Sequence, residues 1–152
     1  MTAKGDDTEG TVFKQWKDGN KENPRKVEVT EAATYEAEYW YGEGVVMYPI
    51  WVCGKQFHAK RLGFNSTNLP TKLTAGEIAY DPDNKLLTLD KAAMNISASE
   101  IGILVGEEES ATELTIKSIN NESAITGTLS FVPLRLVNAQ VTMTGDKKLT
   151  WQ

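Results

Sequence analysis

Cysteine and histidine, which build many catalytic and metal centres, are scarce in this chain. Its 152 residues include one of each. The single cysteine, Cys53, excludes an internal disulfide and a cysteine-rich metal site, and its place in an alternating apolar run predicts a small buried side chain. His58 has no second histidine or neighbouring carboxylate for a metal site or a catalytic triad, so we expect a surface or strand residue. The sequence therefore predicts no catalytic residue, no metal and no cofactor, and a protein that is not an enzyme.

Long apolar runs and blocks of one charge are also missing. Because no run of 18 apolar residues is present, we expect no membrane insertion. The formal net charge is -5, with lysines and glutamates interspersed, whereas nucleic-acid binding calls for a basic stripe, so we expect no nucleic-acid partner. Residues 1–10 lack the apolar core of a secretory signal. Either the chain is cytosolic or it is the mature part of an exported protein, and we favour the second.

What the chain has instead is a strand pattern that begins at Thr11. Apolar residues recur at every second position and are separated by Gly, Asn, Asp and Pro clusters, as in Ile78 and Tyr80 before the turn at residues 81–84. This pattern predicts an all-β fold. We expect a disordered segment over residues 1–10, a small β meander over 11–44 and a β-solenoid-like module over 45–152, with the boundary near Gly44.

The meander is expected to have three strands, formed by residues 13–16, 25–30 and 34–40. Between the first two, Asp18 and Gly19 favour a turn. Strict alternation places Trp16, Tyr35 and Tyr39 on one face, and we expect them to form the core of this small unit.

Weak internal self-similarity predicts how the larger module is built. The segments that begin at Leu87 and Leu134 both read Leu-x-Leu-x-x-Ala-x-apolar, and shorter copies begin at Leu114 and Leu149. Their spacing is irregular but near one coil of a short right-handed β-solenoid, in which stacked coils bury a continuous apolar ladder. Pro133 suits a corner of such a coil, because proline cannot donate to a strand ladder. An antiparallel β-sandwich is the alternative.

Residues 13–39 carry the most specific pattern in the chain. Its fixed positions read Phe13-x-x-Trp16-x-Asp18-Gly19, then Asn23-Pro24-Arg25-x-Val27-x-Val29-Thr30, then Ala33-Thr34-Tyr35-x-Ala37-x-Tyr39. The pattern resembles a bacterial cell-surface repeat related to internalin-B-type repeats, which is common in secreted proteins of gut Bacteroidetes. The family unit begins with a glycine-rich strand pair that residues 1–10 do not supply, so the resemblance implies a truncated repeat. It also implies an extracellular or cell-surface location.

The remainder of the chain is similar to a second kind of surface module. The matching motifs are residues 48–56, Tyr-Pro-Ile-Trp-Val-Cys-Gly-Lys-Gln, and residues 76–92, Gly-Glu-Ile-Ala-Tyr-Asp-Pro-Asp-Asn-Lys-Leu-Leu-Thr-Leu-Asp-Lys-Ala. They resemble a module that follows such repeats in uncharacterised Bacteroidetes surface proteins, where similar strands open a right-handed β-helix-like domain. The resemblance implies a β-helix-like surface module and carries no catalytic residues.

Acidic clusters are the first candidates for chemistry. Asp81 and Asp83 are potential Ca²⁺ ligands, but Asp-Pro-Asp-Asn is an ordinary turn and lacks the further carboxylates of a calcium loop. The glutamates at residues 107–109 are interpreted as a solvated loop tip. A glycosidase needs two converging carboxyl groups, but in the repeat alignment Asp90 stands opposite Lys117 and Val137. This alignment predicts no such pair.

Aromatic residues are the better lead. Trp40 and Tyr41, at the junction of the two modules, and Trp51 in the following strand are candidates to stack against sugar rings. These three residues form the predicted carbohydrate-binding site, and packing between modules is the simpler interpretation of the same side chains.

The sequence thus predicts a non-enzymatic extracellular or cell-surface module of a gut-type bacterium, with a structural or adhesive role. Carbohydrate binding through exposed aromatics is the alternative, and a polysaccharide-active enzyme is the third possibility considered. The expected partner is a glycan or a protein on the extracellular side. Residues 148–152 read as a last strand whose edge invites dimerisation.

Overall fold

The computed structural model describes residues 1–5, 11–28, 32–41, 45–69, 71–128 and 130–152, except for the side chains of residues 40 and 41. Within these ranges the chain forms strands and no helix, so none of the described residues belongs to a helix able to cross a membrane. The chain divides into two compact units, Met1–Val46 and Met47–Gln152. The all-β prediction is confirmed.

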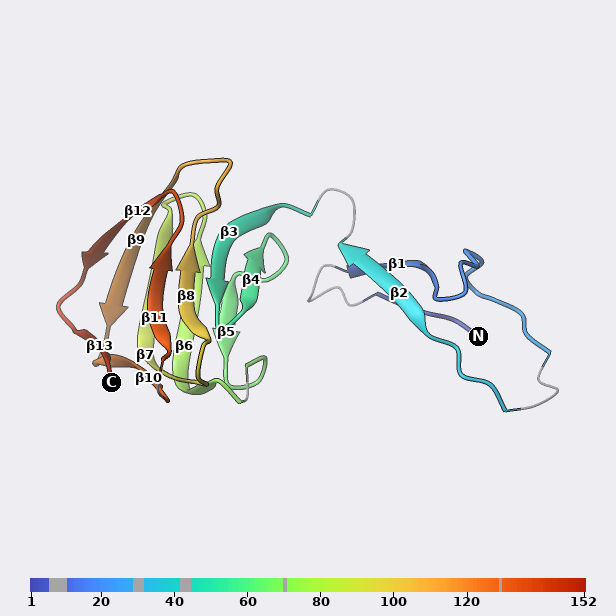
Figure 1. The fold of residues 1–152 in the computed structure, drawn as a ribbon. Helices are drawn as coiled ribbons and strands as arrows, with labels where there is room; N and C mark the ends of the chain where they lie inside the picture. The colour runs from blue at the N-terminus through green and yellow to red at the C-terminus, as the bar shows by residue number, and fades with distance from the viewer. Residues whose placement is uncertain (6–10, 29–31, 42–44, 70, 129) are drawn as a thin grey trace. The chain divides into compact units, whose positions relative to one another are not determined.

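The first unit contains one antiparallel pair of strands in its described residues, β1 (Thr11–Trp16) and β2 (Ala37–Tyr41) (Figure 1). Trp16 is buried and its indole Nε1 donates a hydrogen bond to the Glu22 carbonyl oxygen at 2.8 Å. Phe13 packs edge-on against the Trp16 ring, with 5.5 Å between ring centroids. Tyr39, which the alternation places in the core, is instead 44% exposed. Trp16 is therefore the centre of this unit, and the prediction for Tyr39 was wrong.

The predicted middle strand of a three-stranded meander is not formed by residues 25–28, and the rest of that segment, 29–31, lies outside the described residues. The chain before it is held by the first residues instead. The Arg25 N–H donates to the Met1 carbonyl, the Met1 amine donates to the Arg25 carbonyl, and the Asn23 side chain exchanges hydrogen bonds with the backbone of Ala3. These contacts fix residues 1–3, part of the segment expected to be disordered. Residues 6–10 lie outside the described ranges.

The second unit is sandwich-like, with two sheets, neither of them closed. The larger sheet has seven strands: β5 (Gly63–Asn65), β6 (Leu73–Asp81), β7 (Leu86–Ile96), β9 (Thr112–Ile119), β10 (Ser123–Gly127), β12 (Ala139–Thr144) and β13 (Leu149–Trp151). The smaller sheet has four: β3 (Met47–Val52), β4 (Lys55–His58), β8 (Ile101–Val105) and β11 (Val132–Leu136). The unit begins close to the boundary predicted near Gly44, a residue outside the described ranges.

Parallel pairing joins the later strands into three ladders. In the first ladder β7 lies beside β9 and β9 beside β12; in the second β7 lies beside β10 and β10 beside β13; in the third β8 lies beside β11 (Figure 1). The chain passes through the three ladders in turn and then returns to the first. At the start of the ladders, β6 pairs antiparallel with β7 and β3 pairs antiparallel with β8.

Residues with positive φ bend the chain between the first and second ladders. Lys91 (φ 51°) and Asn120 (φ 64°) occupy equivalent places after β7's first half and β9. Gly145 (φ 103°) follows β12 and lies two positions earlier in the register, beside Ser118. On the neighbouring strand β6, Gly76 has φ 74°, and a Cβ atom there would lie 2.3 Å from the Asp90 carbonyl oxygen. Only glycine fits that position without moving the backbone of β7.

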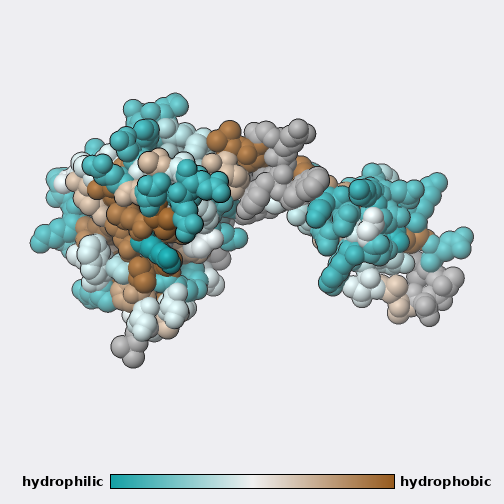
Figure 2. Space-filling model, turned by 45° about the horizontal axis from the view of Figure 1, so that its top comes forward, coloured by the Kyte–Doolittle hydropathy of each residue, from teal (hydrophilic) through white to brown (hydrophobic). Residues whose placement is uncertain are grey.

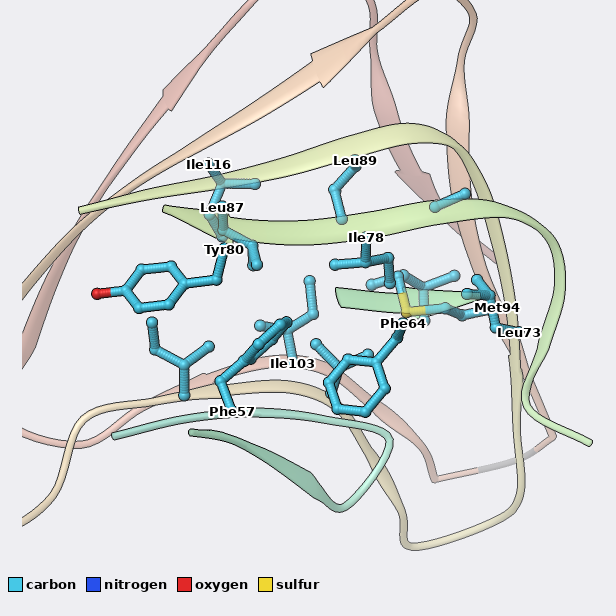
Figure 3. Packing of buried hydrophobic residues seen from close by; sticks show 14 of the residues in the cluster. Phe57, Phe64, Leu73, Ile78, Tyr80, Leu87, Leu89, Met94, Ile103 and Ile116 are labelled. Carbon is cyan, nitrogen blue, oxygen red and sulfur yellow. The ribbon is translucent and has the colours of Figure 1, made fainter. Parts of the chain in front are cut away.

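The core lies between the two sheets of the second unit. Phe57 and Phe64 meet edge-on with ring centroids 4.7 Å apart, and Tyr80 contacts Phe57 (Figure 3). Tyr80 also contacts the Tyr48 ring. The surrounding core residues are aliphatic and come from both sheets: Ile50, Val52, Leu73, Ile78, Leu87, Leu89, Met94, Ile96, Ile103, Val105, Leu114, Ile116 and Ile125. Alternation along each strand supplies these side chains, as the sequence predicts.

The register between strands differs from the predicted repeat alignment. Leu87 lies beside Ile116, and not beside Leu114. Leu134 lies beside Ile103 in the third ladder, so it is not equivalent to Leu87 in the first. Both residues of such pairs face the core, and a shift by two residues keeps every side chain on its face. The internal similarity therefore predicted the facing of the side chains but not their partners.

Candidate functional site

Trp51 is the predicted site residue whose side chain the structure places. It lies in β3 between Ile50 and Val52, which are both buried, so the alternation of the strand turns Trp51 toward the other face of the four-stranded sheet. Its pairing partners across the sheet are Gln56 on β4 and Leu104 on β8. The indole therefore stands on the outer face of this sheet, half-buried by its neighbours.

A pocket of about 270 Å³ opens beside this tryptophan. Leu104 and Ile101 of β8 supply further apolar wall, and the turn before β8 supplies Ser99 and Glu100. The turn after β3 closes the pocket with Cys53 and Gly54, both at positive φ. The site thus combines one aromatic plane with a hydroxyl and a carboxylate at its rim, a mixture typical of small-ligand pockets.

The two potentially reactive groups of this pocket, the Cys53 thiol and the Glu100 carboxyl, differ in their charge at neutral pH. Burial raises the pKa of the Cys53 thiol to about 11, so the sulfur is protonated at neutral pH and is a poor nucleophile. The Lys72 ammonium, followed by the Ser97 N–H, lowers the pKa of the Glu100 carboxyl. Glu100 is therefore an anion at neutral pH, held in place by Lys72 and by the Ser97 N–H at 2.6 Å. The pocket offers a fixed negative charge and no thiolate.

The other two predicted site residues, Trp40 and Tyr41, lie in β2 of the first unit. Their backbones pair with Val12 and Thr11 on β1. Their side chains lie outside the described residues, so the site predicted at these two residues stays a prediction. Ser99, Glu100 and Leu104 were not predicted as site residues. The one local signal is the Ser97-x-x-Glu100 spacing, which is typical of a turn in which a carboxylate accepts from a backbone N–H.

The acidic clusters have structural partners of their own. Asp81 accepts hydrogen bonds from the backbone N–H groups of Asp83 and Asn84 and from the Asn84 side chain, and the Asn84 side chain is the main cause of the lowered pKa of the Asp81 carboxyl. Glu107 accepts from the Ser110 hydroxyl at 2.8 Å. Both clusters are thus turns, as predicted from sequence.

The repeat alignment placed Asp90 opposite Lys117, but in the structure Asp90 does not lie beside Lys117. It lies beside Ile119, and its carboxylate accepts a hydrogen bond from the Asn120 side chain at 2.8 Å, a bond that joins β7 to the bend after β9. The correction follows from the register of the first ladder, which is shifted by two residues from the predicted one.

His58 lies in β4 and is completely buried, so the strand interpretation holds and the surface interpretation was wrong. Its Nδ1 accepts a hydrogen bond from the Lys60 N–H at 3.3 Å. The adjacent Arg61 is also buried; it donates to the Gln56 carbonyl at 2.9 Å and lies over the Phe64 ring. These contacts anchor the β4–β5 connection to the core.

A second depression, of about 260 Å³, lies on the outer side of the first ladder. Thr115 and Thr142 are paired across β9 and β12, and Glu113 and Gln140 form the next pair on the same face, two residues closer to the strand starts. The Lys85 ammonium lies 3.3 Å from the Glu113 carboxylate at the rim. This polar depression differs from the Trp51 pocket, which is mainly apolar. Figure 2 shows both kinds of surface on the second unit, with apolar area gathered near the middle of the visible face.

No family model, no curated protein and no solved structure matches this chain.

Proposed function

We propose that this protein is a non-enzymatic extracellular or cell-surface module of a gut-type bacterium, with a structural or adhesive role. In this proposal residues 45–152 form a short right-handed β-solenoid that presents a rigid lateral face to a partner. The resemblance of residues 13–39 to a cell-surface repeat supports the location. The parallel ladders of the second unit support the architecture.

The ladders carry the architectural part of the proposal. Ile116 lies beside Leu87, 29 residues earlier, and Met143 lies beside Ile116, 27 residues earlier. Leu134 lies beside Ile103, 31 residues earlier, on a different side of the unit. Recurrence of this length on successive sides is the period of a solenoid coil. The right hand follows from the general preference of parallel β crossovers.

The adhesive role is assigned to the outer side of the first ladder. Its polar side chains are paired across β9 and β12, which hold them in fixed positions, so a partner would not have to order them on binding. Beads coated with the full chain should be retained on mucin and on host-cell layers, and Thr142→Arg, within the polar depression, should lower retention severalfold. Thr67→Arg, in the exposed β5–β6 connection, is the matched control. Retention no higher than that of uncoated beads would contradict the adhesive role.

Location has a separate test. Protease applied to intact cells of the producing bacterium should remove the protein, and a cytosolic enzyme measured in parallel should survive. Protection of the protein until the cells are lysed would contradict an extracellular or cell-surface location.

Carbohydrate binding is the second candidate, and the Trp51 pocket is the observation that favours it. An indole plane can stack on the apolar face of a pyranose, while the Ser99 hydroxyl donates or accepts and the Glu100 carboxylate accepts hydrogen bonds from sugar hydroxyls. A glycan array should show signals that Trp51→Ala abolishes and that Tyr39→Ala, a change at an exposed aromatic of the first unit, leaves intact. Trp40→Ala tests the predicted junction site. The absence of any glycan signal would remove this candidate.

A further inference from the structure

Burial falls abruptly along each parallel ladder of the second unit. In the first ladder Leu87 and Ile116 are fully buried, but Met143, next in line on β12, is 47% exposed. In the second ladder Met94 and Ile125 are buried, but Trp151 on β13 is 54% exposed. Each of these exposed side chains is paired with a residue of the preceding strand in the ladder whose own side chain points into the core.

The third ladder behaves in the same way. Val105 on β8 is buried, whereas its partner Leu136 on β11 is 45% exposed. Val132, the partner of Ile101, is also an exposed large apolar residue. We define the end face as the outer edges of β11, β12 and β13 together with their exposed apolar side chains Val132, Leu136, Met143 and Trp151.

The end face also carries backbone groups available for pairing. Among the described strands, β11, β12 and β13 each pair with one neighbour, whereas β7, β8, β9 and β10 each have strands along both edges. A row of N–H and C=O groups along such an edge is a template for a further strand. A pocket of about 130 Å³, lined by Met143, Leu149 and Trp151 among others, opens on this face. It exceeds the roughly 30 Å³ that one water occupies in the liquid, so it has room for a side chain.

The opposite end of the same ladders shows how the chain closes such an edge. There β6 pairs antiparallel with β7, and β3 pairs antiparallel with β8. The side chains behind these pairs, such as Leu87 and Val105, are completely buried. Antiparallel strands are therefore the cover that this sequence uses to close a ladder.

We propose that a second copy of this chain docks on the end face, by a two-fold axis that brings the edges of β11, β12 and β13, taken as a set, against the same set of edges in the partner. A two-fold axis lying in the plane of the end face reverses the sense in which the partner's three strands run around that face. Every strand pair across the interface is then antiparallel, as β6 and β3 are at the other end. The same rotation sets apolar end-face side chains against apolar ones.

The charges beside this face are compatible with its meeting itself. The β12–β13 turn contains Asp146, Lys147 and Lys148, and the Lys147 ammonium lies 3.6 Å from the Asp146 carboxylate. A patch with both signs can pair with its own copy, whereas a patch of one sign would repel it. Because the interface is isologous, it closes at two copies and forms no filament.

Sedimentation velocity over a concentration series tests the proposal. The full chain should change from monomer to dimer with rising concentration, and Met143→Lys or Trp151→Lys should raise the dimer Kd by at least about tenfold, because each places a charge in the centre of the interface. Val46→Lys makes the same kind of change at an exposed apolar residue outside the end face and should leave the Kd unchanged. Circular dichroism of each variant reports whether it folds.

Hydrogen–deuterium exchange supplies a readout that does not need the variants. Amides of β11, β12 and β13 should exchange more slowly in the dimer than at dilutions where the protein is monomeric, whereas amides of β7 and β8 should not change. A chain that stays monomeric up to about 1 mM, or that forms oligomers beyond the dimer, would overturn the proposal. A dimer whose end-face amides are not protected from exchange would also overturn it. The same holds if these amides become protected only when an extended peptide is added. The proposal does not depend on the proposed surface role, and a strictly monomeric chain would leave that role standing.

Discussion

The two ends of the parallel ladders use the same kinds of residue but reach different states. At the first end, Leu87 and Val105 are sealed by the antiparallel strands β6 and β3. At the last end, Met143 and Leu136 hold the same ladder positions and remain about half exposed. The difference teaches that burial here depends on whether a further strand covers the outer edge of the ladder, and not on the hydrophobicity of the residue itself.

The largest expected effect separates the two ends directly. Leu87→Ala removes buried methyl groups from a packed core and should lower the free energy of unfolding by about 3 kcal/mol. Met143→Ala, in the same ladder, should lower it by about 1 kcal/mol or less, because much of that side chain is already in water. Urea denaturation at concentrations where the protein is monomeric measures both. Equal losses would contradict the comparison.

The next effect concerns the strand that seals the first end. Gly76→Ala should destabilise the protein by about 2 kcal/mol, because φ is positive there and the added Cβ would meet the Asp90 and Lys91 carbonyl oxygens. Gly54→Ala is the control, since φ is also positive but no atom lies within 4 Å of the added Cβ. In thermal denaturation, the melting temperature of Gly76→Ala should be clearly lower than that of Gly54→Ala. A reversed rank would show that β6 does not approach β7 this closely.

A smaller effect is expected at the bend between the first and second ladders. Asn120→Ala loses the hydrogen bond to Asp90 and places alanine at φ 64°, so it should lower the free energy of unfolding by about 1.5 kcal/mol. Asn120→Gly loses the same bond but tolerates the positive φ, so a loss of about 0.5 kcal/mol is expected. Chemical denaturation of the two variants separates the two contributions. A glycine variant less stable than the alanine variant would disprove this account.

The smallest effect is a pH dependence at the sealed end, where Lys72, just before β6, pairs with Glu100, just before β8. Because the folded-state pKa of Glu100 is lowered from 4.5, its contribution is present above pH 4.5 and is lost as the pH falls through the folded-state pKa. Lys72→Met removes the main cause of that shift. The melting temperatures of the wild type and Lys72→Met should differ at pH 6 and converge as the pH falls below 4. A constant difference over that range would contradict the assignment.

Period-two alternation predicted the fold class and most of the inward-facing residues. It placed Ile78, Leu87 and Leu89 inward, and all three are buried. It could not decide register, because shifting a strand by two residues leaves the same faces inward. This is why Leu87 was aligned with Leu114 although it lies beside Ile116. The same error placed Asp90 opposite Lys117.

Within the first unit, local propensity failed for a different reason. Residues 25–28 read as strand, but Arg25 and the nearby Asn23 exchange hydrogen bonds with residues 1–3, a segment without strand signals. Strand formation depends on the partner that a segment meets, which its own residues do not specify. The candidate site shows the same limit. Trp51 was predicted, but Ser99 and Glu100 reach it through the pairing of β3 with β8.

The sequence by itself therefore determined that the chain is built from strands, which residues face inward, and that Trp51 is a candidate contact residue. These properties follow from alternation and turn chemistry within a few neighbouring residues. Only the tertiary structure decided which strands meet, which carboxylate lies beside Trp51, and which end of the ladders is sealed. Such choices depend on contacts between residues about thirty positions apart or more, where the loss of chain entropy is balanced by packing against a specific partner. The open end face is the clearest case, because its residues are as apolar as those of the core.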